Sequence, residues 1–319
     1  MITTKDLTKR FGKLVAVDSL TMQVEAGELF GFLGPNGAGK TTTINMLTGL
    51  IRPTAGTATI CDYDVQTQAS QVKAITGLMP DTPHLYETLT GRQFVRFIAD
   101  LYEIDPKRSE QRMEALLEAF DLIDTADALI KSYSYGMQKK ILLTAVLVHE
   151  PRVLFLDEPT IGLDVVAKAR IRQFIQKINT EREVTVVLTT HDLDDVEKLC
   201  KRVILIDNAR LCFDGELATL RRLLSTERLL SVDYAEVYPD VSIPNAHVIY
   251  REGARVQYRF SPEEISTADL IGAILQKFKI VDISVQEPDI EELIKTVYED
   301  NLTLERKLTV PISPSTQAN

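Results

Sequence analysis

The sequence predicts an α/β fold in which helices cover both faces of a mostly parallel sheet, followed by a smaller α+β domain. Apolar runs bounded by turn residues recur along the chain, and a glycine-rich loop follows the first of them. After Leu224 the pattern changes to short alternating segments. We therefore predict a first domain at 1–224, a small α+β domain at 225–300 and a disordered tail at 301–319.

Four apolar runs are expected to form buried parallel strands. They are almost continuously apolar rather than alternating, as strands are when helices cover both faces of a sheet. The runs span 29–33, 153–156, 184–188 and 203–206.

The segments between and after these strands have a different pattern. Residues 90–148 are rich in Leu, Ala, Glu, Arg and Lys at helical spacing, with Pro106 as a break, and predict an inserted helical subdomain. In the second domain, alternation at 256–260 predicts a strand and the pattern at 267–278 an amphipathic helix. Asp289, with Glu292 at capping-box spacing, predicts the start of a last helix.

The composition weighs against several classes of protein. A net charge of −10 argues against a broad nucleic-acid-binding face, because an excess of Lys and Arg holds phosphate backbones. The three cysteines are scattered, which predicts neither a disulfide framework nor a zinc site and fits a reducing cytoplasm. The first residues lack the apolar core of a signal peptide, and apolar stretches such as 141–148 are too short to span a membrane. Any membrane role is expected to come through a partner.

A phosphate-binding loop of the pattern GxxxxGK[ST] stands after the first predicted strand and before a helix, where the motif must stand. Its backbone N–H groups and the following helix dipole favour phosphate. We expect Lys40 to bridge the β- and γ-phosphates and Thr41 to supply a hydroxyl to Mg²⁺. A glycine-rich turn that binds nothing is disfavoured by this placement. The loop comprises Gly34, Pro35, Asn36, Gly37, Ala38, Gly39, Lys40, Thr41 and Thr42.

Two adjacent carboxylates end the second predicted strand, at the edge of the sheet where ligands gather in open α/β folds. Asp157 is expected to hold Mg²⁺. Glu158 is expected to face the γ-phosphate and to activate the attacking water. Alone, the pair would be read as an acidic loop after a strand, but the phosphate loop favours the catalytic interpretation.

The run Tyr-Ser-Tyr-Gly-Met-Gln-Lys-Lys at 133–140 resembles the signature sequence of the ATP-binding cassette (ABC) family. The resemblance implies a P-loop NTPase fold with an antiparallel β subdomain and a helical subdomain. It also implies a head-to-tail dimer in which Ser134 and the backbone of Gly136 contact the γ-phosphate held by the other subunit. Tyr135 replaces the first glycine of the usual pattern and Met137 its glutamine, a version similar to the drug, antibiotic and sodium export (ABC-2 type) branch. Without the resemblance, Ser134 is simply a good helix N-cap.

Four further positions follow the order of the family. Gly162-Leu163-Asp164 resembles the loop that couples the two nucleotide sites, and His191 resembles the histidine that bonds the γ-phosphate. The acidic residues at 192–195 are interpreted as first-turn charges of a helix. Phe11 is where relatives place an aromatic ring on adenine. Asp81 replaces a glutamine that touches Mg²⁺; we expect it to reach the metal directly or through water and to contribute to hydrolysis, the alternative being that it only starts a turn after Pro80.

The resemblance implies an ATPase subunit that uses ATP and Mg²⁺ to drive transport, with export favoured over import. Its expected partners are a polytopic membrane permease and a second, identical or paired ATPase subunit, at the cytoplasmic face of the cell membrane. One rival is a soluble ABC ATPase acting on the ribosome or DNA, although such chains usually carry two cassettes or a long coiled coil. Another, a nucleotide-binding module without turnover, is disfavoured by Glu158. The cargo cannot be read from a chain that lacks the membrane subunit.

Overall fold

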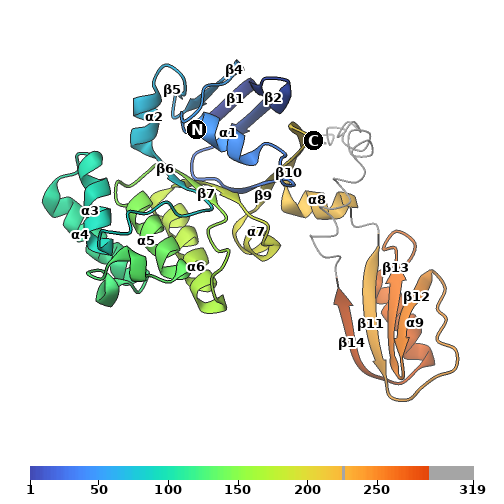
Figure 1. The fold of residues 1–319 in the computed structure, drawn as a ribbon. Helices are drawn as coiled ribbons and strands as arrows, with labels where there is room; N and C mark the ends of the chain where they lie inside the picture. Colours follow the sequence, from blue (N-terminus) through green and yellow to red (C-terminus); the bar gives the residue numbers. More distant parts are fainter. Residues whose placement is uncertain (225–226, 287–319) are drawn as a thin grey trace, which may run out of the picture. The chain divides into compact units, whose positions relative to one another are not determined.

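The computed structural model describes residues 1–224 and 227–286. The chain divides into two compact units, Met1–Glu216 and Leu217–Asn319, and the division falls immediately before the helix α8 (Leu217–Leu224) (Figure 1). Each unit has its own hydrophobic core. The predicted last helix from Asp289 and the predicted tail at 301–319 lie outside the described residues.

Within the described residues, the main sheet of the first unit has six strands in the order β10-β9-β3-β8-β7-β6. The strands from β9 to β6 run parallel, and β10 pairs antiparallel with β9. Because parallel strands end at one edge, the loops after β3, β6, β7 and β8 are brought to the same side. The strands are β3 (Leu29–Leu33), β6 (Thr76–Met79), β7 (Val153–Asp157), β8 (Thr185–Thr189), β9 (Arg202–Asp207) and β10 (Arg210–Glu216).

The predicted buried strands are confirmed. The runs at 29–33, 153–156, 184–188 and 203–206 correspond to β3, β7, β8 and β9 within one residue at each end. Their side chains are almost all buried, as expected for strands covered on both faces.

An antiparallel sheet in the order β2-β1-β4-β5 forms a second layer of the first unit. One hydrophobic core joins Ile2 and Leu7 of this sheet, Ile44 of α1, and Phe30 and Phe155 of the main sheet. The antiparallel β subdomain implied by the resemblance is therefore present. Its elements are β1 (Ile2–Phe11), β2 (Leu14–Val24), α1 (Lys40–Leu47), β4 (Ala55–Ile60), β5 (Tyr63–Asp64) and α2 (Ala69–Ile75).

Helices α6 (Val165–Arg182) and α7 (Leu193–Leu199) lie on the opposite side of the main sheet from α1 (Figure 1). Helix α6 buries Ile171, Ile175 and Ile178 along one face. The interpretation of the acids at 192–195 as first-turn charges holds for Asp194, which lies in the first turn of α7 and pairs with Lys198. It is incomplete for the neighbouring Asp195.

Asp195 is fully buried, and its carboxylate accepts hydrogen bonds from the Thr160 hydroxyl and the Arg172 guanidinium. A carboxylate can be buried in this way because a cation and a hydroxyl replace its water. Asp195 therefore joins α7 to α6 and to the loop after β7.

The segment predicted to be helical contains three α-helices between β6 and β7. Thr90 and Gln93 form a capping box at the start of α3, and Asp105 caps α4, in which Pro106 is the first residue. Pro106 therefore separates two helices by starting the second. The elements are α3 (Gly91–Leu101), α4 (Pro106–Ala119), the short 3₁₀ helices η1 (Ile123–Thr125) and η2 (Ile130–Ser132), and α5 (Tyr135–Leu147).

The second unit contains an antiparallel sheet in the order β12-β13-β11-β14, with α9 packed on one face. Leu230, Val256 and Phe260 of the sheet share a core with Leu270 and Ile274 of α9. The predicted strand at 256–260 lies in β13, and the predicted helix at 267–278 corresponds to α9. The elements are β11 (Arg228–Tyr234), β12 (Ala246–Glu252), β13 (Arg255–Phe260), α9 (Thr267–Lys277) and β14 (Ile280–Gln286).

Across residues 1–224 and 227–286, every helix falls short of the length or the apolar character that crossing a bilayer requires.

Candidate functional site

The phosphate loop joins the end of β3 to the start of α1, as the motif predicts. A side chain at Gly34 would place Cβ 2.4 Å from the carbonyl oxygen of Ile206, and one at Gly39 would place it 2.3 Å from that of Ala16. Gly39 also has φ +107°, which disfavours other residues. Helix α1 has no side-chain N-cap and no acid in its first turn, so its free N–H groups are available to an anion.

The side chain of Lys40 folds back onto the first residues of this loop. Its ammonium donates to the carbonyl oxygens of Gly34 (2.6 Å) and Pro35 (3.1 Å). Burial lowers the pKa of Lys40, while the charges of Asp157 and Glu158 oppose the change. These contacts place a cation beside the backbone N–H groups of the loop and of the start of α1, an arrangement that fits the phosphates of a nucleotide.

The carboxylates Asp157 and Glu158 follow from the C-terminal end of β7. Asp157 accepts a hydrogen bond from the hydroxyl of Thr189 on the neighbouring strand. Glu158 is only 7% exposed and accepts from the hydroxyl of Thr190 at 3.2 Å. Burial raises the pKa of Glu158 from its ordinary value of 4.5 to about 7, although the Thr190 hydrogen bond opposes this. A carboxyl that titrates near neutral pH is suited to take a proton and release it.

His191 lies between the phosphate loop and Glu158. Its Nε2 is 3.1 Å from Asn36 Oδ1 and 3.6 Å from Glu158 Oε1. The loops after β3, β7 and β8 thus converge as the parallel sheet requires. This brings together five predicted site residues: Asn36, Lys40, Asp157, Glu158 and His191.

The residues predicted to hold Mg²⁺ fit a magnesium site in which phosphate oxygens supply further ligands. Thr41 lies exposed in the first turn of α1, after β3, and Asp157 ends β7, which is separated from β3 by one strand at the same edge of the sheet. Among the described residues there is no group of three or more His, Cys, Asp or Glu placed to hold a metal by itself. A hydroxyl and one carboxylate suffice for Mg²⁺ in P-loop ATPases because the substrate completes the shell. Asp81, the third predicted ligand, lies 3.6 Å from the ammonium of Lys139.

The signature segment forms the start of α5. Ser134 is the N-cap and accepts from the Met137 N–H at 3.3 Å, so the alternative capping role is present. A side chain at Gly136 would place Cβ 3.1 Å from Leu163 of the coupling loop. Asp164 ends that loop as the N-cap of α6, accepting from the Ala167 N–H at 2.8 Å.

The first position of the usual glycine pair is filled by the ring of Tyr135, which packs on Gly162. A Cβ at Gly162 would lie 2.7 Å from Tyr135 Cε1, and Gly162 has φ +75°. Both the space and the backbone therefore require glycine at 162. Through this contact the signature segment and the coupling loop of one chain lie against each other.

Phe11 ends β1 with half of its surface exposed, and the ammonium of Lys9 lies 5.0 Å from its ring centroid. An exposed ring is available to stack on a base. Its role in adenine binding stays a prediction.

Sequence reasoning missed two polar residues of the site. Thr190, which bonds Glu158, directly precedes His191, so its position after a buried strand was the available signal. Lys139 lies in the signature run, but nothing in the sequence distinguishes it from the adjacent Lys140. The structure buries Lys139 completely and directs its ammonium to the carbonyl oxygen of Glu158.

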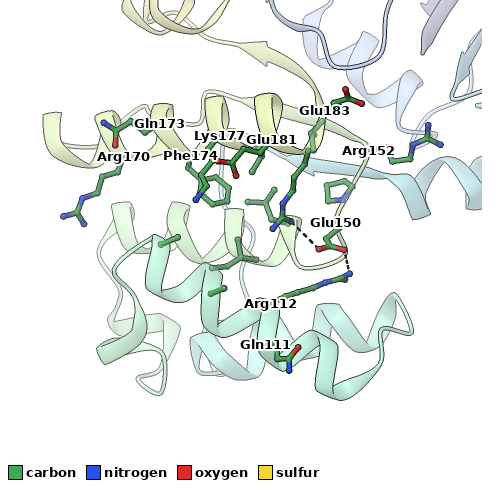
Figure 2. A pocket seen from close by; sticks show the side chains of 18 of the residues that line it. Gln111, Arg112, Glu150, Arg152, Arg170, Gln173, Phe174, Lys177, Glu181 and Glu183 are labelled. Carbon is green, nitrogen blue, oxygen red and sulfur yellow. Dashed lines mark hydrogen bonds and ion pairs between the residues drawn. The ribbon is translucent and has the colours of Figure 1, made fainter.

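A cavity of about 1010 Å³ lies elsewhere, between α4, α6 and the segment before β7 (Figure 2). In it, Glu150 accepts from the guanidinium groups of Arg112 and Arg182. Its lining includes no residue of the phosphate loop, and we therefore place the candidate nucleotide site at the edge of the sheet.

Comparison with known proteins identifies the family of the chain. The family model described as ABC transporter matches residues 17–161. The linearmycin resistance ATP-binding protein LnrL of Bacillus subtilis is 30% identical over 301 residues, covering 92% of this chain and 96% of LnrL. The chain belongs to the ABC transporter family. As an ABC ATP-binding subunit, it binds and hydrolyses ATP.

Other relatives of this ABC ATPase are named for drug resistance and export. The daunorubicin resistance ATP-binding protein DrrA3 of Streptomyces coeruleorubidus is 37% identical, with 72% of each chain covered. The Nod factor export ATP-binding protein I of Burkholderia lata is 35% identical, with 74% of this chain and 76% of that protein covered.

Solved structures support the ABC ATPase fold. An ATP-binding subunit of an ABC transporter has a TM-score of 0.66 at 29% identity, covering 70% of this chain and 92% of that one. A dimeric ATP-binding cassette bound to ADP and Pi has a TM-score of 0.63 at 23% identity, covering 68% and 99%, and shows the shared fold.

Proposed function

We propose that this ABC ATPase drives export through a separate membrane subunit by closing and opening a head-to-tail dimer around ATP. The observation that carries the chemistry is the placement of Glu158, which is buried, titrates near neutral pH and lies 3.6 Å from His191 beside the phosphate loop. A base of this kind is what phosphoryl transfer to water requires.

We propose the following roles for the site residues, which their positions support. Lys40 and the backbone donors of the loop bind the phosphates, and Phe11 stacks on the adenine. Thr41 and Asp157 hold Mg²⁺, which neutralises phosphate charge when bound. Glu158 accepts the proton of the attacking water, and His191 donates a hydrogen bond to the γ-phosphate.

The proposed dimer gives a role in nucleotide binding to residues of the signature segment and the coupling loop. Ser134 and Gly136 lie together with Asp164 on the surface formed by α5 and the coupling loop. In a head-to-tail dimer, Ser134 and Gly136 complete the γ-phosphate site of the partner. Hydrolysis then depends on closure.

The direction and partners of transport are inferred from the relatives. Three of them are named for linearmycin resistance, daunorubicin resistance and Nod factor export. Together with the Tyr-Ser-x-Gly-Met signature, they support export of drug-type molecules through a polytopic permease, with this chain peripheral on the cytoplasmic face of the membrane. Import and action on the ribosome or DNA receive no such support, and the net charge of −10 weighs against a nucleic-acid partner.

Two measurements on Glu158→Gln test the proposal. The variant should keep ATP and Mg²⁺ binding, lose turnover and accumulate as a dimer on ATP in size-exclusion chromatography. In cells that lack the native gene, parental protein should restore expulsion of a drug-type substrate and the variant should not. Hydrolysis at the parental rate would refute the role of Glu158, and complementation by an inactive variant would refute the transport function.

A further inference from the structure

A fully buried ammonium lies behind the candidate site. Lys139 on α5 has no exposed surface, and its Nζ donates to the carbonyl oxygen of Glu158 at 2.6 Å. The carboxylate of Asp81, in the loop after β6, lies 3.6 Å from the same Nζ. A buried cation needs polar partners in place of water. Its partners here are the backbone of the proposed base and a carboxylate on another loop.

The carbonyl that Lys139 holds belongs to a backbone in an unusual conformation. Glu158 has φ +49°, in the left-handed region that residues with a Cβ rarely adopt. Its N–H donates to the Thr189 carbonyl oxygen at 2.9 Å, and its own carbonyl accepts from Lys139. The backbone of Glu158 is thus fixed from both sides, in the conformation that places its carboxylate on the Thr190 hydroxyl.

The loop after β6 contacts the same group of residues through Tyr135. The Tyr135 hydroxyl donates to the carbonyl oxygen of Asp81 at 3.5 Å, and the ammonium of Lys139 lies 5.6 Å from the Tyr135 ring centroid. The ring and the carboxylate therefore face the same cation. Asp81 and Tyr135 are also two of the three positions, with Met137, at which the chain departs from the usual ABC pattern. The two departures meet at Lys139.

We propose that Lys139 is a positioning residue that couples the Asp81 loop to the proposed base. The Asp81 carboxylate balances the charge of the buried ammonium, and the ammonium fixes the carbonyl of Glu158. A displacement of the Asp81 loop thereby changes the support of Glu158, without a contact between Asp81 and the nucleotide. The inference rests on the proposed function, because it takes Glu158 to be the base.

The first test replaces Lys139 by Met, which has a similar length and no charge, in the full-length chain. Because Lys139 acts on the base and not on the nucleotide, kcat should fall by about tenfold to a hundredfold while ATP affinity, measured with a fluorescent ATP analogue, stays within about twofold. Lys139→Arg should restore part of kcat. Lys140→Met, at the adjacent half-buried lysine, is the matched control and should leave kcat unchanged. A parental kcat in a folded Lys139→Met variant would overturn the proposal.

The second test combines Asp81→Asn with Lys139→Met. Asp81→Asn alone should lower kcat severalfold, and it should add little once Lys139 is Met, because the pair acts as one unit. The same non-additivity should appear in melting temperatures measured without nucleotide. If the two fold-changes in kcat simply multiply, Asp81 acts elsewhere, as a ligand of Mg²⁺ would, and the coupling is refuted.

Two outcomes separate this inference from the proposed function. If Glu158→Gln retains hydrolysis, the base assignment fails and the inference fails with it. If Glu158→Gln abolishes hydrolysis but Lys139→Met does not slow it, only the inference fails. If Lys139→Met does not fold, Asp81→Asn decides the question, because Asp81 is half-exposed and its replacement should be tolerated. A parental kcat in Asp81→Asn would then overturn the coupling.

Discussion

Replacement of Glu158 by Gln should stabilise the nucleotide-free protein, and the gain should depend on pH. The free carboxyl titrates near 4.5 and the buried one near about 7, so at about 1.4 kcal/mol per pH unit ionisation costs the folded state about 3 kcal/mol above both values. The unfolded chain loses this proton first as the pH rises. Stability is therefore lost between about pH 4.5 and pH 7, and Gln, which stays neutral, avoids that loss.

The gain can be measured by thermal melting with EDTA and without nucleotide. At about pH 8, Glu158→Gln should melt higher by about 6–12 °C, at about 2–4 °C per kcal/mol for a unit of this size. At about pH 5 the difference should correspond to less than about 1 kcal/mol, because this pH lies only about half a unit above the unfolded pKa of 4.5 and little of the loss has accumulated. The Gln amide oxygen can still accept from Thr190, which keeps the comparison close. Glu118→Gln, at an exposed position on α4, should show no gain.

If Glu158→Gln and the parental protein melt at the same temperature at about pH 8 as well as at about pH 5, burial of the Glu158 carboxylate does not destabilise the folded state and the argument is refuted. The same titration should appear in the parental enzyme as a kcat/KM that rises through about pH 7, since the base must be ionised to accept a proton. A rate that is flat across this range would contradict the role of Glu158 even if the stability data agree.

Three further substitutions and one control test other parts of the structure. Lys40→Ala removes charge-assisted contacts to phosphate and should weaken ATP binding by about 2 kcal/mol, roughly thirtyfold, in equilibrium titrations; unchanged binding would contradict the phosphate-loop assignment. Phe11→Ala should raise the KM for ATP about tenfold with little change in melting temperature, and an unchanged KM would exclude adenine stacking. Asp195→Ala should lower the free energy of unfolding by about 3 kcal/mol in urea, because it removes the closest and only buried carboxylate partner of the mostly buried Arg172 guanidinium and leaves the more distant Asp192 and Asp194 among the described residues. Asp194→Ala, at the exposed neighbour, should cost less than about 1 kcal/mol.

The sequence predicted the edge of the sheet well because short motifs determine it. Four apolar runs located β3, β7, β8 and β9 within one residue at each end, and the phosphate loop and Asp157 and Glu158 follow directly from two of these strands. The position of His191 after β8 brought it to the same edge. Parallel strands made this convergence predictable without knowledge of the packing.

Buried polar residues could not be predicted in this way. Lys139 and Lys140 are adjacent in the sequence, and only the packing of α5 decides which one turns inward. Asp195 was predicted to be a first-turn charge of a helix, yet it is fully buried against Arg172, a partner on a different helix. Pairs between distant segments, such as Asp81 with Lys139, have no local sequence signal.

The ring of Tyr135 occupies the space that a side chain at Gly162 would need, so the contact couples the sizes of these two residues. The signature segment has a ring at the position where the usual family pattern has a glycine, and the coupling loop has a glycine where any Cβ would collide with that ring. The two positions are therefore interdependent, and neither can change alone without a clash or a void. Because the Tyr135 hydroxyl also reaches Asp81, the face offered to the second subunit in the proposed dimer is shaped by the loop after β6. A movement of the loop after β6 would then change the surface of the proposed dimer interface through Tyr135, without any change at the bound phosphates.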